Sequence, residues 1–226
     1  NFYLDKLNVR NIKSIGNLKF IENNNFKTDK ADKKIFSQFK KYKTFIAAST
    51  HESEELFAAR THILLNKRNK NIITIIIPRH INRVEQIISE VSELGLKVVT
   101  RSSNKVELKN TDIFIVDTFG ESEKFYKFAT TVFLGKSIVK GGGQNPLEPA
   151  RFGAKILHGP GVSNFKDVYK YLKQLKISSE VNSPKKCANS VIFKKNMKKV
   201  KKMKYLGSRI LKKTLNELDK SIHNEI

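Results

Sequence analysis

Short hydrophobic runs alternate with helix-like stripes along most of the chain. The run 72–77 is apolar, rich in β-branched residues and followed by Pro78, as expected of a strand that is buried on both faces. The next segment places apolar residues at the spacing of one helix face, namely Val84, Ile87, Ile88 and Val91. The same reading predicts further strands at 44–48, 96–99, 112–116, 131–134 and 155–157. This alternation predicts an α/β fold with a Rossmann-like, doubly wound parallel sheet.

The connections between these strands carry their own signals. Ser49 and Glu52 have the spacing of a capping box, which predicts a helix from residue 49 to about 65. Strands 96–99 and 112–116 are expected to be joined by a polar, hairpin-like loop. Shorter helices are expected after Gly120, at Pro146 and after Asn164. From about residue 179 the alternation weakens and leads into a long, lysine-rich helix.

Turn-forming and polar residues follow five of the predicted strands, after residues 48, 77, 116, 134 and 157. In open α/β sheets, ligands bind at the carboxyl ends of the strands. We therefore expect these loops to converge on one ligand site.

The segment 141–165 carries the most specific pattern. Gly141, Gly142 and Gly143 can bring backbone N–H groups close to an anion, because no Cβ intervenes. Asn145 is a suitable N-cap, and Pro146 suits the first turn of a helix whose positive end would face the glycines. Glu148 would lie in that first turn, where it can accept hydrogen bonds from sugar hydroxyls. The pattern favours a phosphate-and-ribose site, and the structural alternative is a glutamate that only caps the helix.

Five ordered motifs over roughly residues 14–175 resemble those of the transferases of 3-deoxy-D-manno-octulosonic acid (Kdo). The glycine segment is one, and the others are Ala47 to Glu52, Pro78-Arg79-His80, Asp117 to Glu121, and Gly159-Pro160 with Asn164-Phe165. The family commonly has histidine where this chain has Gln144, and an amide cannot take part in proton transfer. Phe119 occupies a position of variable size.

The resemblance implies the donor-binding, C-terminal domain of a metal-independent glycosyltransferase of the GT-B type. Such an enzyme transfers Kdo, with inversion, from CMP-Kdo to a lipid A precursor (lipid IV-A) in lipopolysaccharide biosynthesis, at the cytoplasmic face of the bacterial inner membrane. Its general base lies in the other domain, so no catalytic residue is expected here and the chain alone is expected to be inactive. The expected organisation is 1–25 as the end of a preceding domain, 26–178 as the CMP-Kdo domain and 179–226 as a helical tail.

The resemblance also assigns the site residues. Contacts to CMP are expected from Pro78, Arg79, Phe119, Gly120, Glu121, Asn145, Pro146, Leu147 and Glu148. Contacts to the donor sugar or phosphate are expected from Ser49, Thr50, His51, Gly141, Gly142, Gly143 and Gln144, with Lys136 and Lys140 balancing charge. Several have a structural alternative: Ser49 can cap a helix, Arg79 can be a surface residue, and Glu121 can occupy a first helical turn. No cofactor is expected, and His62, His158 and His223 lack the spacing of metal ligands.

Charge adds a further consideration. The formal net charge is +23, which suggests a polyanionic partner. Lysine dominates, and it gathers toward the C-terminus rather than among aromatic residues, which favours an anionic membrane surface over nucleic acid. A solvated helix face explains the lysines equally well. The single cysteine, Cys187, excludes an internal disulfide and fits a reducing compartment.

Two other functions are left open by the sequence. One is a non-catalytic CMP-sugar-binding remnant or subunit of a split transferase. The other is a nucleic-acid-binding module, which rests on charge alone.

Overall fold

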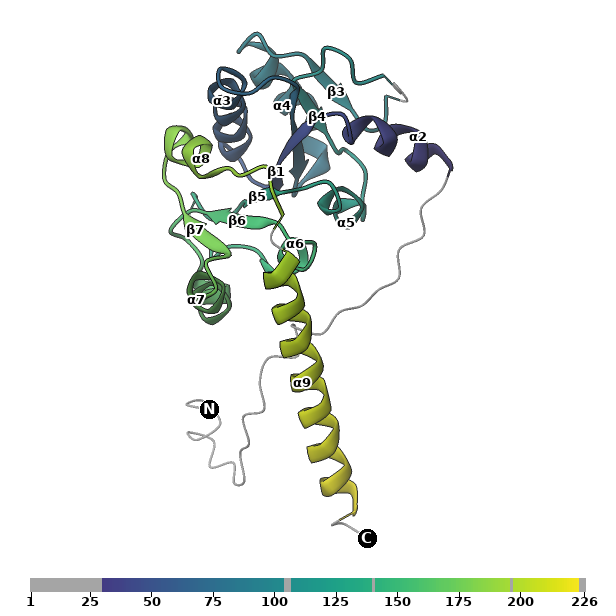
Figure 1. The fold of residues 1–226 in the computed structure, drawn as a ribbon. Helices are drawn as coiled ribbons and strands as arrows, with labels where there is room; N and C mark the ends of the chain where they lie inside the picture. The colour runs from purple at the N-terminus through teal and green to yellow at the C-terminus, as the bar shows by residue number, and fades with distance from the viewer. Residues whose placement is uncertain (1–29, 104–106, 140, 196, 224–226) are drawn as a thin grey trace. The chain divides into compact units, whose positions relative to one another are not determined.

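A computed structural model describes residues 30–103, 107–139, 141–195 and 197–223. A seven-stranded sheet has the order β3-β4-β2-β1-β5-β6-β7, and every neighbouring pair is parallel (Figure 1). The strands are β1 (Lys43–Thr50), β2 (Ile72–Pro78), β3 (Val98–Thr100), β4 (Ile113–Ile115), β5 (Thr131–Leu134), β6 (Lys155–His158) and β7 (Ser178–Glu180). The predicted parallel α/β fold is confirmed.

Helices cover both faces of this sheet. They are α2 (Lys30–Phe39), α3 (Glu54–Asn66), α4 (Val84–Ser92), α5 (Ser122–Tyr126), α6 (Leu147–Arg151), α7 (Lys166–Gln174) and α8 (Pro184–Ser190), with 3-10 turns η2 (Ile81–Arg83) and η3 (Ser163–Phe165). On one face, α3, α4 and α8 bury their apolar residues against β1, β2 and β5. On the other, Phe36 and Phe39 of α2 meet Phe114 and Phe125 edge to face, with Phe39 and Phe114 centroids 5.2 Å apart. The apolar stripe that the periodicity predicts, Val84, Ile87, Ile88 and Val91 of α4, lies in the first of these layers.

The helix α9 (Met197–His223) is described by itself, because residues 26–200 form a separate compact unit. It is the predicted lysine-rich helix. Within the described residues, no helix combines the length and apolar character needed to cross a bilayer.

Three parts of the fold differ from the prediction. The connection between β3 and β4 is no hairpin, because Val98 pairs with Ile113 in parallel register. Helices α2 and α8 and strand β7 were not predicted. α8 and β7 are short and polar, whereas α2 has an apolar stripe of Ile35, Phe36 and Phe39 that the prediction overlooked. Cys187 lies in the core on α8, although the sequence around it is polar and lysine-rich, and burial raises the pKa of its thiol to about 12.

The position of β1 determines where a ligand can bind. β1 lies at the centre of the sheet, paired with β2 on one side and with β5 on the other. After β1 the chain enters α3 on one face, whereas after β5 it leads to α6 and the opposite face (Figure 1). The loops diverge, and such a topological switch point leaves a crevice at the carboxyl edge of the sheet.

Candidate functional site

A pocket of about 70 Å³ lies at this carboxyl edge. Its lining comes from the carboxyl ends of β1 and β2 and from the segments that follow β2 and β4: Ser49, Ile77, Pro78, Arg79, Ile81, Thr118, Phe119, Gly120 and Ser122. The Arg79 N–H donates to the Thr50 carbonyl at 3.0 Å and holds the β2 loop beside β1. Three of the predicted motifs therefore meet, as the strand order requires.

The pocket is smaller than a nucleotide. Enclosed ligand sites usually measure about 300–1,000 Å³, so only part of a nucleotide fits inside. Phe119 at its rim is 81% exposed, and the Arg79 side chain is also exposed. An aromatic face and a guanidinium thus extend the pocket onto the open surface.

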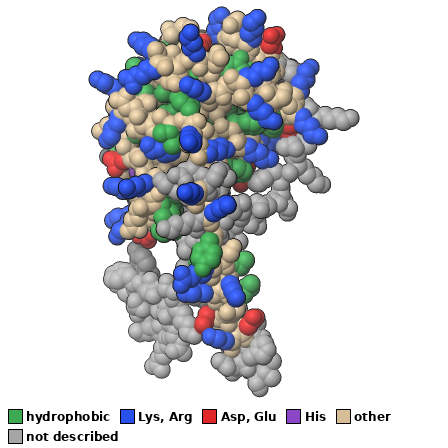
Figure 2. Space-filling model, in the orientation of Figure 1, with side chains coloured by type: hydrophobic (Ala, Val, Ile, Leu, Met, Phe, Trp, Pro, Cys, Tyr) green, Lys and Arg blue, Asp and Glu red, His purple; other side chains and the backbone are tan. Residues whose placement is uncertain are grey.

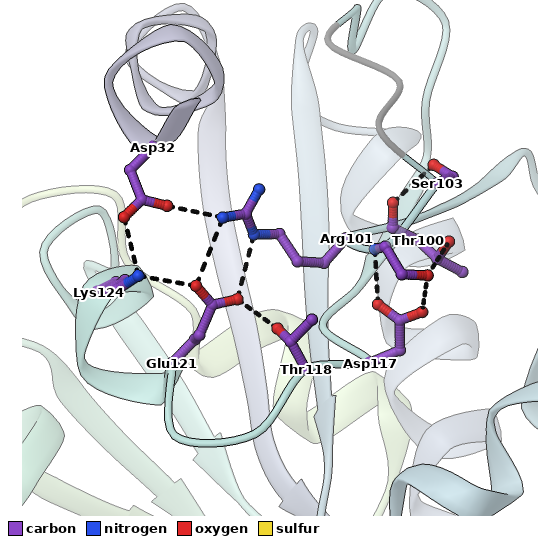
Figure 3. A network of polar contacts seen from close by, with 9 residues as sticks. Asp32, Thr100, Arg101, Ser103, Asp117, Thr118, Glu121 and Lys124 are labelled. Carbon is purple, nitrogen blue, oxygen red and sulfur yellow. Dashed lines mark hydrogen bonds and ion pairs between the residues drawn. The ribbon is translucent and has the colours of Figure 1, made fainter. Parts of the chain in front are cut away.

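The turn that carries Phe119 is held by a network of charges (Figure 3). The fully buried Asp32 of α2 accepts a hydrogen bond from Arg101 at 2.7 Å and one from Lys124 at 2.8 Å. The Glu121 carboxylate accepts from the same two cations, at 3.1 Å from Arg101 Nε and 2.8 Å from Lys124 Nζ, and from the Thr118 hydroxyl. Two carboxylates and two cations balance one another.

A second contact fixes the start of the same turn. The Asp117 carboxylate accepts the backbone N–H of Ser102 at 2.9 Å and also the Ser102 hydroxyl (Figure 3). The β4 loop is therefore bound to the β3 loop at both ends.

The network changes what Glu121 can do. Burial raises the pKa of its carboxyl, but hydrogen bonds from Lys124, Thr118 and Arg101 outweigh burial and lower the pKa to about 2. The carboxylate is engaged by the protein itself. A nucleotide contact at Glu121 is thus left to the backbone of the turn.

Glu54 joins the β1 loop to the β5 loop. Its fully buried carboxylate accepts four backbone N–H groups, from His51 at 3.0 Å, Lys136 at 2.7 Å, and Ser137 and Ile138 at 3.0 Å each. The two loops that diverge at the switch point are therefore fixed by one side chain.

These loops also approach each other at the backbone. Ser49 and Lys136 both have left-handed conformations, with φ of 53° and 55°. A Cβ on Gly135 would lie 2.3 Å from the Ser49 carbonyl oxygen, so only glycine fits there. Left-handed conformations are energetically unfavourable for residues other than glycine, and they are often found at functional sites.

The capping-box prediction at Ser49 and Glu52 is wrong. Ser49 belongs to β1, and α3 begins at Glu54 after Ser53, whose side chain makes no capping hydrogen bond. A glutamate does reach back three residues to an N–H, but the pair is Glu54 and His51. Thr50 is fully buried, whereas Ser49 and His51 are partly exposed and can be reached by a ligand.

The glycine run is packed within its own loop. Gly142 and Gly143 are buried with φ of 83° and 78°, and the Gly143 N–H donates to the Lys136 carbonyl at 2.8 Å. The Gly142 carbonyl accepts the Asn164 N–H at 3.0 Å, and the Asn164 side chain fills the place of a Gly142 Cβ. The N–H of Gly143 is thus committed to the protein, while Gly141 is exposed. Lys140 lies outside the described residues.

The helix after the glycines begins one residue later than predicted. α6 begins at Leu147 rather than Pro146 and spans five residues, so its dipole is small. The Asn145 side chain still accepts the Leu147 N–H, at 3.1 Å. Gln144 is half-buried, and its backbone carbonyl accepts the Tyr169 hydroxyl at 3.1 Å.

Glu148 is half-buried on α6, and its carboxyl group interacts electrostatically with that of Glu123 on α5. Burial raises the pKa of the Glu148 carboxyl, and Arg151 opposes that rise. The described residues provide it with no hydrogen bond. It is therefore a carboxyl group able to accept hydrogen bonds from a ligand.

Sequence reasoning missed the residues that hold the site in place. Glu54, Asp32, Arg101 and Lys124 make contacts between segments far apart in the chain, which no local spacing signals. The sequence shows acidic residues at 52, 54 and 55 after Ser49, but not that Glu54 is buried. Within the described part of the chain, no three His, Cys, Asp or Glu side chains are grouped to hold a metal ion.

Comparisons with known proteins cover most of the chain. No protein-family model matches it. The 3-deoxy-D-manno-octulosonic acid transferase of Haemophilus influenzae is 31% identical over 183 residues, which cover 79% of this chain and 41% of that protein. That of Rickettsia bellii is 29% identical over 189 residues, covering 84% and 45%. The chain spans less than half the length of these relatives.

The fold has a solved counterpart in the C-terminal CMP-Kdo binding domain of WaaA from Acinetobacter baumannii. The TM-score is 0.65, with 81% of this chain and 97% of that domain covered. The sequence identity is 20%, so this likeness concerns the fold. By its sequence, the chain belongs to the Kdo transferase family, and its described residues have the fold of the WaaA C-terminal domain.

Proposed function

We propose that this chain binds the nucleotide donor CMP-Kdo and is the donor-binding part of a glycosyltransferase. The observation that carries the proposal is the meeting of Ser49, Pro78-Arg79 and Thr118 to Gly120 around one pocket beside the switch point. Family membership and the fold of a CMP-Kdo binding domain support the choice of ligand.

The residues have distinct roles in this proposal. Arg79 can hold the phosphate through two parallel hydrogen bonds, Phe119 and the Gly120 backbone face the cytosine, and Glu148 accepts the ribose hydroxyls. When the sugar is transferred, charge develops on the departing phosphate, and a fixed cation stabilises it. Kdo transfer to a lipid A precursor, and the general base, would belong to the complete transferase.

Calorimetric titration with CMP tests the ligand. CMP should bind and UDP should compete poorly, because the donor is a nucleoside monophosphate. UDP displacing CMP at equal concentration would contradict the proposal. The complete transferase should also transfer Kdo. If it binds CMP but transfers no Kdo, the alternative of a non-catalytic CMP-sugar-binding subunit is favoured.

The Glu148→Gln variant tests the ribose contact. Hydrogen bonds to a charged group contribute about 1.5–3 kcal/mol, which corresponds to a loss of affinity of about tenfold to 150-fold. Affinity for 2′,3′-dideoxy-CMP should change much less, because the hydroxyl partners are missing. Glu123→Gln removes a neighbouring half-buried carboxyl and should leave CMP affinity nearly unchanged. Equal losses for both ligands would support a purely structural Glu148.

A second proposal concerns α9, which we assign to an anionic membrane surface on the cytoplasmic side. Leu211, Leu215 and Leu218 follow one another at helical spacing and are exposed, the last two by 50% and 54%. Exposed basic residues, among them Arg209 and Lys212, lie on the same helix, and Figure 2 shows hydrophobic and basic side chains next to each other along α9. Such a helix can lie in a lipid interface.

Vesicle sedimentation separates this proposal from nucleic-acid binding. The chain should sediment with vesicles of phosphatidylserine and phosphatidylcholine but less with phosphatidylcholine alone. Leu215→Gln with Leu218→Gln should reduce that binding without changing retention of random duplex DNA. Unchanged vesicle binding by this variant would indicate that charge alone carries the binding, and would contradict the proposal.

A further inference from the structure

Two histidines meet at the carboxyl edge, outside the lining of the pocket. His51 follows β1 and His80 follows β2, and their rings touch edge to face with centroids 5.5 Å apart. Arg79 adjoins His80 in sequence, and Lys136 of the β5 loop acts electrostatically on His51. Groups that are or can become positive thus gather from three loops.

The protonation of His51 follows from its hydrogen bond. Its Nδ1 lies 3.1 Å from the Ser49 carbonyl oxygen, which can only accept. Nδ1 must therefore carry the hydrogen, and in the neutral ring Nε2 has a lone pair. Nε2 can donate a hydrogen bond to an anion only after the ring has gained a proton.

We propose that His51 binds an oxyanion of the nucleotide donor through protonated Nε2, with His80 positioning its ring, so that donor binding takes up a proton. The oxyanion is the phosphate or the sugar carboxylate. This inference rests on the proposed function, because it concerns the same ligand.

The surroundings agree with a proton gained on binding. Burial lowers the pKa of His51; the Ser49 carbonyl and Glu54 oppose that change, while His80 and Lys136 add to it. The free ring is therefore mostly neutral at pH 7. An anion beside Nε2 shifts the balance toward the charged form.

Titration calorimetry in buffers of different ionisation enthalpy counts the protons taken up. The probes are CMP methyl ester, a phosphodiester of constant charge, free Kdo, which carries only the carboxylate, and cytidine, which carries neither. The wild-type chain should take up a proton with the ester or with Kdo, but none with cytidine. Its affinity for that probe should fall at least about tenfold between pH 5.5 and 8, the change that one pKa unit produces.

Two variants identify the group that titrates. His51→Gln should remove both the proton uptake and the pH dependence, while cytidine affinity stays near that of the wild type. His80→Phe keeps a ring against His51 and should preserve the pH dependence. Imidazole ¹⁵N spectra should show the Nδ1–H form of His51 in the free protein at high pH.

The outcomes are separable. The same pH dependence in wild type and His51→Gln, its loss in His80→Phe alone, or an Nε2–H form of neutral His51 would overturn the inference while the proposed function stands. No binding of CMP methyl ester, Kdo or cytidine would overturn both.

Discussion

Replacing Glu54 with glutamine tests whether one carboxylate fixes the two loops at the centre of the site. Oε2 accepts the N–H groups of His51 and Lys136, and Oε1 accepts those of Ser137 and Ile138. Whichever oxygen becomes NH₂, two backbone donors then face another donor. At about 1.5–3 kcal/mol for each bond to a charged acceptor, losing two costs about 3–6 kcal/mol. Total stabilities are about 5–15 kcal/mol, so Glu54→Gln should bring the domain close to unfolding.

Thermal and urea unfolding followed by circular dichroism measures this loss. In a chain of this size the midpoint should fall by about 2–4 °C for each kcal/mol, or about 6–24 °C in all. Glu52→Gln makes the same chemical change at an exposed position in the same loop, and should stay within about 0.5 kcal/mol of the wild type. A Glu54→Gln protein that unfolds within about 1 kcal/mol of the wild type would refute the argument.

Three further predictions concern the same edge. The pKa of Glu121 is about 2 in the folded protein, against an ordinary value of 4.5, so its stabilising effect is complete above pH 4.5 and is lost as the pH falls toward 2. Glu121→Gln should flatten the dependence of stability on pH in that window, and an unchanged slope would count against the network. Phe119→Ala should weaken CMP binding by about fivefold to 150-fold, the effect of about 1–3 kcal/mol of base stacking, while Phe119→Tyr retains affinity and neither changes the melting temperature. Gly135→Ala forces a Cβ to within 2.3 Å of the Ser49 carbonyl oxygen and should cost about 1–3 kcal/mol; an unaltered melting temperature would show that the loops can separate.

The fold could be predicted where one residue pattern determines one element. The strand 72–77 consists of isoleucine apart from Thr74 because it is buried on both faces, and α4 shows a clear apolar stripe. Strand β7 is polar and short, and α8 is held mainly by Cys187 and Ala188 against the core, so neither has a periodicity to detect. The prediction of a hairpin between β3 and β4 was wrong. The sequence shows two strands joined by a loop without a helix, but it does not show whether the strands pair in parallel or antiparallel.

The candidate site also has a part that the sequence predicts and a part that it does not. Residues that follow strands could be predicted, because a parallel sheet brings its carboxyl ends together, and Ser49, Arg79 and Phe119 share one pocket. Contacts that depend on three-dimensional distance could not. Nothing in the sequence pairs Asp32 with Arg101. The glycines looked like an anion cradle because their freedom of φ is visible in sequence, whereas the internal partner of the Gly143 N–H is not.

The central place of β1 has a consequence for how the chain reaches this fold. β1 is the first strand of the sheet along the chain, yet its two edges are completed at different times. β2 follows after a single helix, whereas β5 is made only after β2, β3, β4 and α5. During synthesis the second edge of β1 therefore stays open, with its N–H and C=O groups free to pair with other chains. The strands that line the pocket are thus made before β5, and the contacts of Glu54 with the loop after β5 form last.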